Sequence, residues 1–219
     1  MRVYYLTGAQ FAISNLALKR IKVSRYRDLN DPFELLGVNL ADRAYRKAFR
    51  QVRDELDQNH GLICFSRTWK NPLIWGHYAE KNSGVALGFD VQDDLLIPVK
   101  YADNLADIEL SPRSGSPSKK VIDYLIRTKF RDWKYEDELR LFTKLDHSTA
   151  QGGLHFLPFS KRLQLREVIL GPRCSLPVAG VRKLVATFPV KVSVIKARIA
   201  FTRFEVLENR AATRADRRA

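Results

Sequence analysis

The chain has 219 residues, of which 45% are hydrophobic and 11% aromatic, and its formal net charge is +14. This composition is typical of one folded domain and excludes a disordered chain, and no apolar run reaches the ~20 residues that span a bilayer, so we predict no membrane partner. Residues 166–219 hold 12 basic and 4 acidic side chains, a net charge of +8. Such a region attracts polyanions, so we predict nucleic acid as its partner; the alternative is a tail that serves only solubility.

The first third of the chain predicts a strand, a helix and a second strand, followed by a loop and a long helix. Residues 2–7 (RVYYLT) are rich in aromatic and branched side chains, which favours a strand. Apolar residues recur at helical spacing over residues 9–18, and basic and apolar residues alternate over residues 18–24. Turn-forming residues over 24–36 indicate a structured loop, and residues 40–58 have the pattern of an amphipathic helix.

Short apolar strands and one short helix are predicted in the middle of the chain. Asn71 and Pro72 mark the start of the helix, because asparagine caps free amides and proline is tolerated at the first helical position. The predicted elements are strands over residues 61–66, 83–90 and 95–101 and the helix over residues 71–80.

The second half of the chain predicts one loop, two helices and several strands. A stretch rich in serine and proline, residues 111–118, indicates a flexible loop. Helices are predicted over residues 118–133 and 177–188, and strands from Glu138 and over residues 153–159, 165–171, 190–195 and 197–207. This irregular mixture predicts a single α+β domain over residues 1–207, with mixed or antiparallel sheets and flanking helices, and a basic, flexible tail over residues 208–219.

The cysteines and histidines indicate neither a metal site nor a disulfide. Cys64 lies in an apolar strand and Cys174 in a turn, and the four histidines are scattered, without the spacing of zinc ligands. Two unpaired cysteines favour a reducing compartment, so we expect a cytoplasmic protein. A Cys–His protease is disfavoured, because a thiolate inside an apolar strand would be costly.

The stretch YEDELR carries two carboxylates that could work together. Glu136 and Glu138 are two residues apart, which in a strand places them on one face, close to Trp133 and Tyr135. In such a pair one acid can react while the other tunes its pKa, and Arg140 could pair with either. The alternative is an exposed strand edge with a surface ion pair that contributes little.

Two further stretches carry small polar groups at strand positions. CFSRT places Ser66 and Thr68 at the end of a buried strand, where hydroxyls can bind a phosphate or a ribose, or merely cap the next element. YYLT places Tyr5 and Thr7 on one face of the first strand.

The short helix at NPLIWGHYAE gathers three unusual side chains on about one turn. Trp75 or Tyr78 could stack on a flat ring of a ligand, and His77 could donate a hydrogen bond to a phosphate or face the target. Alternatively, Trp75 and Tyr78 are core residues on one helix face, and His77 is a partly buried histidine bonded to a backbone carbonyl.

The motif order over residues 3–142 resembles a known family. The series YYLT, NDPFE, ICFSR, NPLIWGHYAEKNSGVALGF and WKYEDELR is similar to the DUF-twenty-nine-seventy-one family, a bacterial family of unknown function often found near phage-defence genes. More remotely, the order resembles ADP-ribosyltransferases, which hold NAD with a first-strand motif and a Ser-Thr-Ser-like motif and carry a later Glu-x-Glu. The matching positions are Tyr5 and Thr7, then Ser66 and Thr68, then Glu136 and Glu138.

This resemblance implies NAD as the substrate that supplies ADP-ribose. It implies that Glu138 stabilises the oxocarbenium-like centre formed when the nicotinamide bond breaks, and that Glu136 orients or deprotonates the acceptor. Tyr5 stands where some branches of the family have histidine, and this departure leaves open a pocket without catalytic activity.

Three functions are compatible with these motifs. The first is an ADP-ribosyltransferase-like defence or toxin-type effector that acts on nucleic acid or protein and could have a cognate antitoxin. The second is a nucleic-acid-binding module with a degenerate pocket. The third, disfavoured, is a metal-dependent nuclease using Asp31, Glu34, Glu136 and Glu138. The first function predicts that Tyr5, Ser66 and Glu138 meet in one cleft.

Overall fold

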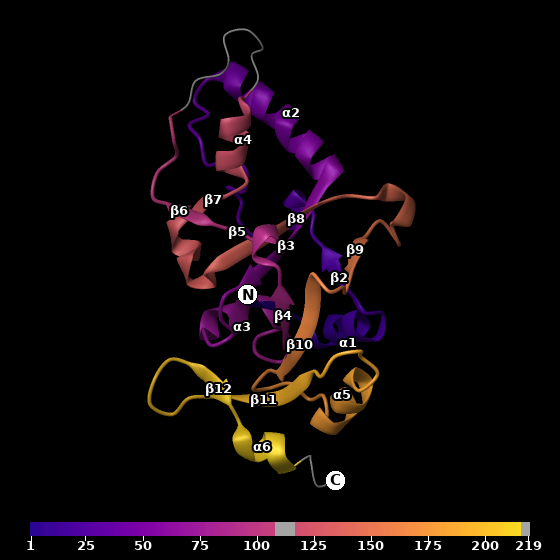
Figure 1. Ribbon diagram of the computed structural model, residues 1–219. Helices are drawn as coiled ribbons and strands as arrows, with labels where there is room; N and C mark the ends of the chain where they lie inside the picture. Colours follow the sequence, from indigo (N-terminus) through magenta and orange to yellow (C-terminus); the bar gives the residue numbers. More distant parts are fainter. Residues whose placement is uncertain (108–116, 216–219) are drawn as a thin grey trace.

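The computed structural model describes residues 1–107 and 117–215, and in this part of the chain eight strands form one mixed sheet (Figure 1). In spatial order the strands are β12 (Val206–Glu208), β11 (Ser193–Ile199), β10 (Leu163–Leu170), β4 (Val85–Val91), β1 (Arg2–Thr7), β3 (His60–Ser66), β8 (Glu138–Lys144) and β5 (Ile97–Pro98). Neighbouring strands run antiparallel except β10 and β11, which are parallel. The predicted α+β class is thus confirmed.

Helices cover both faces of this sheet, and two short ladders lie beside it. The helices are α1 (Ala9–Ala17), α2 (Arg43–Asn59), α3 (Pro72–Tyr78), α4 (Lys119–Leu125), α5 (Val178–Val185) and α6 (Arg210–Ala215). The ladders pair β2 (Arg20–Val23) with β9 (His155–Pro158) and β6 (Lys100–Ala102) with β7 (Thr128–Phe130). None of the described helices is both long and apolar enough to cross a membrane.

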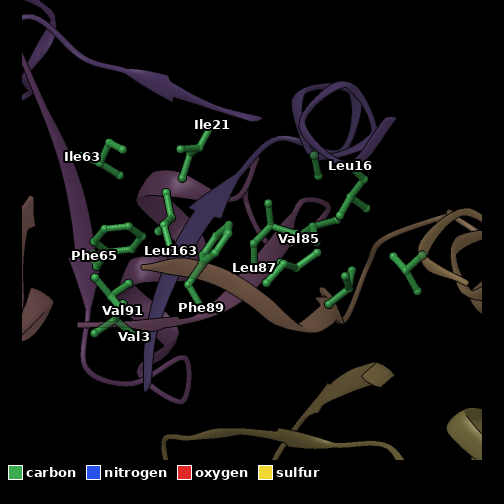
Figure 2. Close-up of a cluster of buried hydrophobic side chains, with 14 of the residues drawn as sticks. Val3, Leu16, Ile21, Ile63, Phe65, Val85, Leu87, Phe89, Val91 and Leu163 are labelled. Atoms are coloured by element: carbon green, nitrogen blue, oxygen red, sulfur yellow. The ribbon is translucent and has the colours of Figure 1, made fainter. Parts of the chain in front are cut away.

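The first face of the sheet is an apolar core covered by α1, β2 and α5. Every second residue of the central strands points to it, including Val3 of β1, Phe65 of β3 and Leu87 of β4. Leu16 of α1 and Ile21 of β2 close the core from outside (Figure 2). The alternation of the sequence produces this face, because residues two apart in a strand point the same way.

The second face is covered in two halves by different helices. Over one half, α3 packs Trp75 against a cluster that includes Ile169 of β10. Over the other half, Phe49 of α2 and Leu125 of α4 pack with Leu62 of β3. Figure 1 shows α2 and α4 at one end of the molecule and α5 and α6 at the other.

The short helix α3 begins where its sequence predicts. The Asn71 side chain accepts a hydrogen bond from the Leu73 amide at 2.9 Å, and Pro72 occupies the first turn. At its other end the chain turns through three left-handed residues, Glu80, Lys81 and Asn82, and returns to the sheet at Gly84. A Cβ at Gly84 would lie 2.3 Å from the Thr7 carbonyl oxygen, so this close approach requires glycine.

Two predicted elements in the second half of the chain differ from the structure. The helix predicted over residues 118–133 ends at Leu125, because the chain leaves it to pair as β7 with β6 and then forms a 3-10 turn at Arg131–Glu136. Residues 111–116 of the predicted flexible loop lie outside the described residues, and Ser118 caps α4.

The region from residue 208 to 215, part of the tail that composition predicts to be flexible, forms regular structure. It contains the end of β12 and helix α6, and Thr213 of that helix is buried against β11. The Thr213 hydroxyl accepts a hydrogen bond from the Lys196 amide at 3.1 Å, and its carbonyl accepts one from Arg182 at 2.7 Å. Residues 216–219 lie outside the described residues.

Candidate functional site

A row of three side-chain positions crosses the second face at the centre of the sheet. Tyr4 of β1 is paired with Ser66 of β3, and Ser66 is paired with Glu138 of β8. One step along, Cys64 is paired with Arg140. This row lies between the two helix-covered halves: Tyr4 packs against the cluster around Trp75, and Cys64 packs against the cluster around Leu62.

Glu136 and Glu138 come together through a backbone turn as well as a strand. Glu138 begins β8, as predicted, but Glu136 belongs to the preceding 3-10 turn rather than to the strand. Asp137 between them has φ 44°, in the left-handed region. This reversal lets both carboxylates reach one cation, Lys129, which approaches Glu136 Oε2 to 2.5 Å and Glu138 Oε2 to 3.1 Å.

Five charged side chains form what we call the buried charge network, and none is more than 8% exposed. Its members are Glu34, Lys129, Glu136, Glu138 and Arg140. Arg140 Nε donates to Glu138 Oε1 at 2.8 Å, and its Nη1 and Nη2 donate to the two oxygens of Glu34 at 2.5 and 2.9 Å. Three acids face two bases, so one proton shared among the acids would make the network neutral.

The environments of the two central carboxylates push their pKa values apart. Burial opposes ionisation of Glu138, but Arg140 and Lys129 outweigh it and lower its pKa to about 2. Burial raises the pKa of Glu136, and Lys129 offsets this only in part. Burial also raises the pKa of Glu34, despite Arg140. Glu138 is thus the fixed anion, and Glu136 and Glu34 are the groups that hold a proton more readily.

Aromatic rings surround the outer side of Glu136, forming what we call the aromatic cluster: His77, Tyr78, Trp133 and Tyr135. The His77 ring lies 5.7 Å from Tyr135 and 6.1 Å from both Tyr78 and Trp133, measured between ring centroids. The Tyr78 hydroxyl donates to Glu136 Oε1. His77 is exposed and the other three rings are partly exposed, so the cluster lies between the solvent and Glu136.

The cation of the network also contacts this cluster. Lys129 Nζ lies 4.9 Å from the centroid of the Trp133 ring. A hollow of about 340 Å³ lies next to Lys129 and is lined mainly by apolar side chains, including Phe33 and Phe130. This volume is at the small end of ligand pockets and has room for one ring or sugar.

Trp75, His77 and Tyr78 have different surroundings although they share one helix. Trp75 is completely buried, and its indole Nε1 donates to the Trp69 carbonyl oxygen at 2.5 Å, so it is a core residue. His77 is exposed rather than a partly buried histidine, and Tyr78 contacts Glu136.

The hydroxyls of Ser66 and Thr68, at the end of β3, form hydrogen bonds within the turn that follows this strand. Ser66 Oγ donates to the Thr68 carbonyl oxygen at 2.8 Å, and Thr68 Oγ1 accepts from the Lys70 amide at 3.1 Å. These bonds cap the segment that leads to α3. Ser66 nevertheless lies directly opposite Glu138, as the motif order predicts.

The predicted cleft of Tyr5, Ser66 and Glu138 is wrong with respect to Tyr5. Tyr5 and Thr7 point to the first face, where the Tyr5 ring lies 6.4 Å from Phe65 within the apolar core. Ser66 and Glu138 point to the second face, and the residue of β1 that joins them is Tyr4. The correct face follows from the strand register, which the sequence alone does not show.

The acidic residues named for a nuclease are distributed differently. Asp31 Oδ1 accepts a hydrogen bond from the Phe33 amide at 2.9 Å, and Glu34 is bound to Arg140. Over residues 1–107 and 117–215, no three histidine, cysteine or acidic side chains are grouped so that they could hold a metal ion.

Four members of the site were missed or only partly foreseen from the sequence. The pairing of Arg140 with Glu138 has a local signal, since residues two apart in a strand share a face. Lys129 has none, because it was predicted within a helix, and Glu34 lies more than 100 residues from its partner Arg140. Tyr4 is visible in the sequence only as the neighbour of Tyr5.

Comparisons with known proteins give no relative for this arrangement. No family model matches the chain, and searches of curated proteins and of solved structures found no match either. The resemblances inferred from the motif order therefore stay predictions, and the chemistry of the site is derived from its own residues.

Proposed function

We propose that this protein is an NAD-dependent enzyme that cleaves the nicotinamide–ribose bond and transfers ADP-ribose. The observation that carries the proposal is the carboxylate pair Glu136 and Glu138, which share Lys129 but have pKa values shifted in opposite directions. Pairs whose environments separate their pKa values are typical of acid–base sites. The paired positions Ser66 and Glu138 also follow the motif order of ADP-ribosyltransferases.

The proposed chemistry divides the work between the two carboxylates. When the bond from the ribose C1′ to nicotinamide breaks, its electron pair leaves with nicotinamide, and C1′ becomes oxocarbenium-like. Glu138, whose lowered pKa keeps it ionised near neutral pH, stabilises this charge electrostatically. The acceptor then attacks C1′ and gives its proton to Glu136, whose raised pKa makes its ionised form a stronger base than an ordinary carboxylate.

The aromatic cluster provides a binding surface suited to the leaving group. Tyr78, Trp133 and Tyr135 offer partly exposed ring faces beside Glu136, on which nicotinamide could stack. The exposed His77 can donate a hydrogen bond to a phosphate of the dinucleotide. As a defence or toxin-type effector, the protein would use nucleic acid or protein as its acceptor.

The test is release of nicotinamide from NAD by the full chain, with and without nucleic-acid acceptors. Glu138→Gln keeps the shape of the side chain and removes its charge, so release should fall by about 100-fold or more. Glu136→Gln should spare hydrolysis by water and reduce transfer to the acceptor. Glu55→Gln, an exposed position on α2, is the matched control and should retain wild-type rates.

The second candidate is a nucleic-acid-binding module in which this pocket is not catalytic. It is favoured by the occupation of Glu138, both of whose oxygens accept hydrogen bonds from Arg140, one of them also from Lys129. Titration calorimetry with NAD separates the two candidates. A wild-type protein that neither binds NAD nor releases nicotinamide contradicts the enzyme and leaves the binding module.

A further inference from the structure

The hairpin between β11 and β12 presents two phenylalanine side chains to solvent. Phe201 is 90% exposed and Phe204 is 100% exposed, more than any other large apolar side chain among the described residues. The hairpin loop is closed by a hydrogen bond from the Ala200 amide to the Glu205 carbonyl oxygen at 2.9 Å. Figure 1 shows this connection reaching away from the edge of the sheet. Two large apolar side chains this exposed on one hairpin indicate a binding surface.

Cationic side chains alternate with these rings. The Arg198 guanidinium carbon lies 4.7 Å from the centroid of the Phe201 ring. Glu205 binds both Arg203 and Lys70, the latter at 3.5 Å, and so holds the hairpin next to the segment before α3. The Val206 amide also donates to the Lys70 carbonyl oxygen at 2.8 Å. The backbone hydrogen bond from Val206 thus holds the hairpin beside Lys70, and the exposed cations lie close to the phenylalanines.

A hollow of about 640 Å³ lies behind the hairpin. Its lining includes four cations, Lys70, Arg198, Arg203 and Arg210, and one carboxylate, Glu208, together with the partly exposed ring of Trp69. The hollow is thus positive and contains an aromatic face. Its size is that of a nucleotide-sized ligand rather than of a long apolar chain.

We infer that the β11–β12 hairpin and the hollow behind it bind single-stranded nucleic acid. Unpaired bases stack on aromatic side chains regardless of sequence, and arginine and lysine contact the phosphates between them. The alternation of Phe201, Arg203 and Phe204 provides both groups along one turn. An anionic membrane would also attract phenylalanines and cations. A flat membrane surface, however, could not reach Trp69 inside the concave hollow.

This inference goes beyond the proposed enzymatic function and does not depend on it. None of the residues that carry it belongs to the buried charge network or to the aromatic cluster. The hairpin is thus tested by binding alone, without NAD.

The experiment is fluorescence anisotropy with labelled oligouridine and oligothymidine of 12 nucleotides, at low salt. Double substitution Phe201→Ala/Phe204→Ala should weaken binding by about tenfold or more, because each lost stacking contact removes a substantial share of the affinity. Lys70→Gln/Arg203→Gln should reduce the slope of log affinity against log salt by about 0.7 for each lost phosphate contact. A duplex of the same length should bind more weakly, since its bases are not free to stack.

Matched controls separate the hairpin from general effects of charge and apolar surface. Phe11→Ala removes an exposed phenylalanine of α1, and Arg50→Gln removes an exposed cation of α2; both should bind as the wild type does. The inference is overturned if the double phenylalanine variant keeps wild-type affinity, or if the protein binds phosphatidylserine vesicles but neither oligonucleotide.

Discussion

The buried charge network and the β11–β12 hairpin use the same kinds of side chain in opposite environments. The Arg140 side chain is 0% exposed and is bound to Glu34 and Glu138, whereas the Arg203 side chain is 61% exposed and forms an ion pair with the neighbouring Glu205. A buried charge must keep its partners because water cannot replace them, but an exposed charge can exchange them freely. The first region therefore fixes structure, and the second remains available to bind.

The largest expected effect is on the fully buried arginine. Arg140→Ala leaves the carboxylates of Glu34 and Glu138 without their main counter-charge, so the free energy of unfolding should fall by about 3–5 kcal/mol. Urea denaturation measures this loss. Arg203→Ala is the matched change in the hairpin and should cost less than about 1 kcal/mol. Equal losses at the two positions would remove the distinction between the regions.

The second effect concerns the stability of the protein at acidic pH. Because the folded pKa of Glu138 is lowered to about 2, this group stabilises the protein above its ordinary pKa of 4.5, and that contribution is lost as the pH falls from 4.5 to 2. Glu136 and Glu34, whose pKa values are raised, act in the opposite direction as the pH rises.

Thermal denaturation over this pH range tests the assignment. The wild type should lose stability steeply between pH 4.5 and 2, and Glu138→Gln, which cannot ionise, should flatten this part of the curve. Glu205→Gln should change the curve much less, because the Glu205 carboxylate, although its pKa is also lowered by Arg203, lies at the surface where its ion pair is screened. If the melting temperature of Glu138→Gln fell with pH as steeply as that of the wild type, the ion pair between Glu138 and Arg140 would be contradicted.

The third effect concerns the turn that joins the two carboxylates. Asp137 is left-handed, a conformation that asparagine and glycine adopt easily but a β-branched residue does not. Asp137→Val should therefore destabilise the fold by about 1–2 kcal/mol and reduce nicotinamide release, because Glu136 and Glu138 would no longer meet at Lys129. Asp137→Asn should be nearly neutral in both assays. A fully active valine variant would show that this turn is not needed.

The smallest effect on stability is expected for the two exposed phenylalanines of the β11–β12 hairpin. Phe201→Ser/Phe204→Ser removes two side chains that are almost fully exposed, so the free energy of unfolding should change by less than about 0.5 kcal/mol. Chemical denaturation of this variant checks that any loss of oligonucleotide binding comes from the missing rings. A large fall in the free energy of unfolding would contradict the exposure of these two side chains.

Local signals in the sequence were sufficient for most elements of the fold. The capping pair Asn71 and Pro72 predicted the start of α3, and the strand starting near Glu138 was confirmed as β8. These features depend on neighbours in the chain. The helix predicted through residue 133 was wrong because β7 exists only by pairing with β6, a contact between distant segments that apolar spacing cannot show.

The candidate site was partly predictable for the same reason. Strand alternation showed that Tyr5 and Thr7 share a face, but only the pairing of Tyr4 with Ser66 shows that this face is the wrong one. Lys129 was missed because a single lysine has no pattern of its own. The exposed rings of the hairpin lie within the strand predicted over residues 197–207, because aromatic residues favour strands whether or not they pack.

The order of the strands in the sheet bears on how the chain can be assembled during synthesis. β1 is made first and lies at the centre, and β3, β4, β10, β11 and β12 are then added outward. β8 is the exception, because it enters between β3 and β5, which both precede it in the chain. A nascent chain that ends before Lys129 lacks both cations of the network, so it can bury Glu34 only with a proton attached. Closure of the half of the second face that α2 and α4 cover therefore has to wait until β8 has left the ribosome.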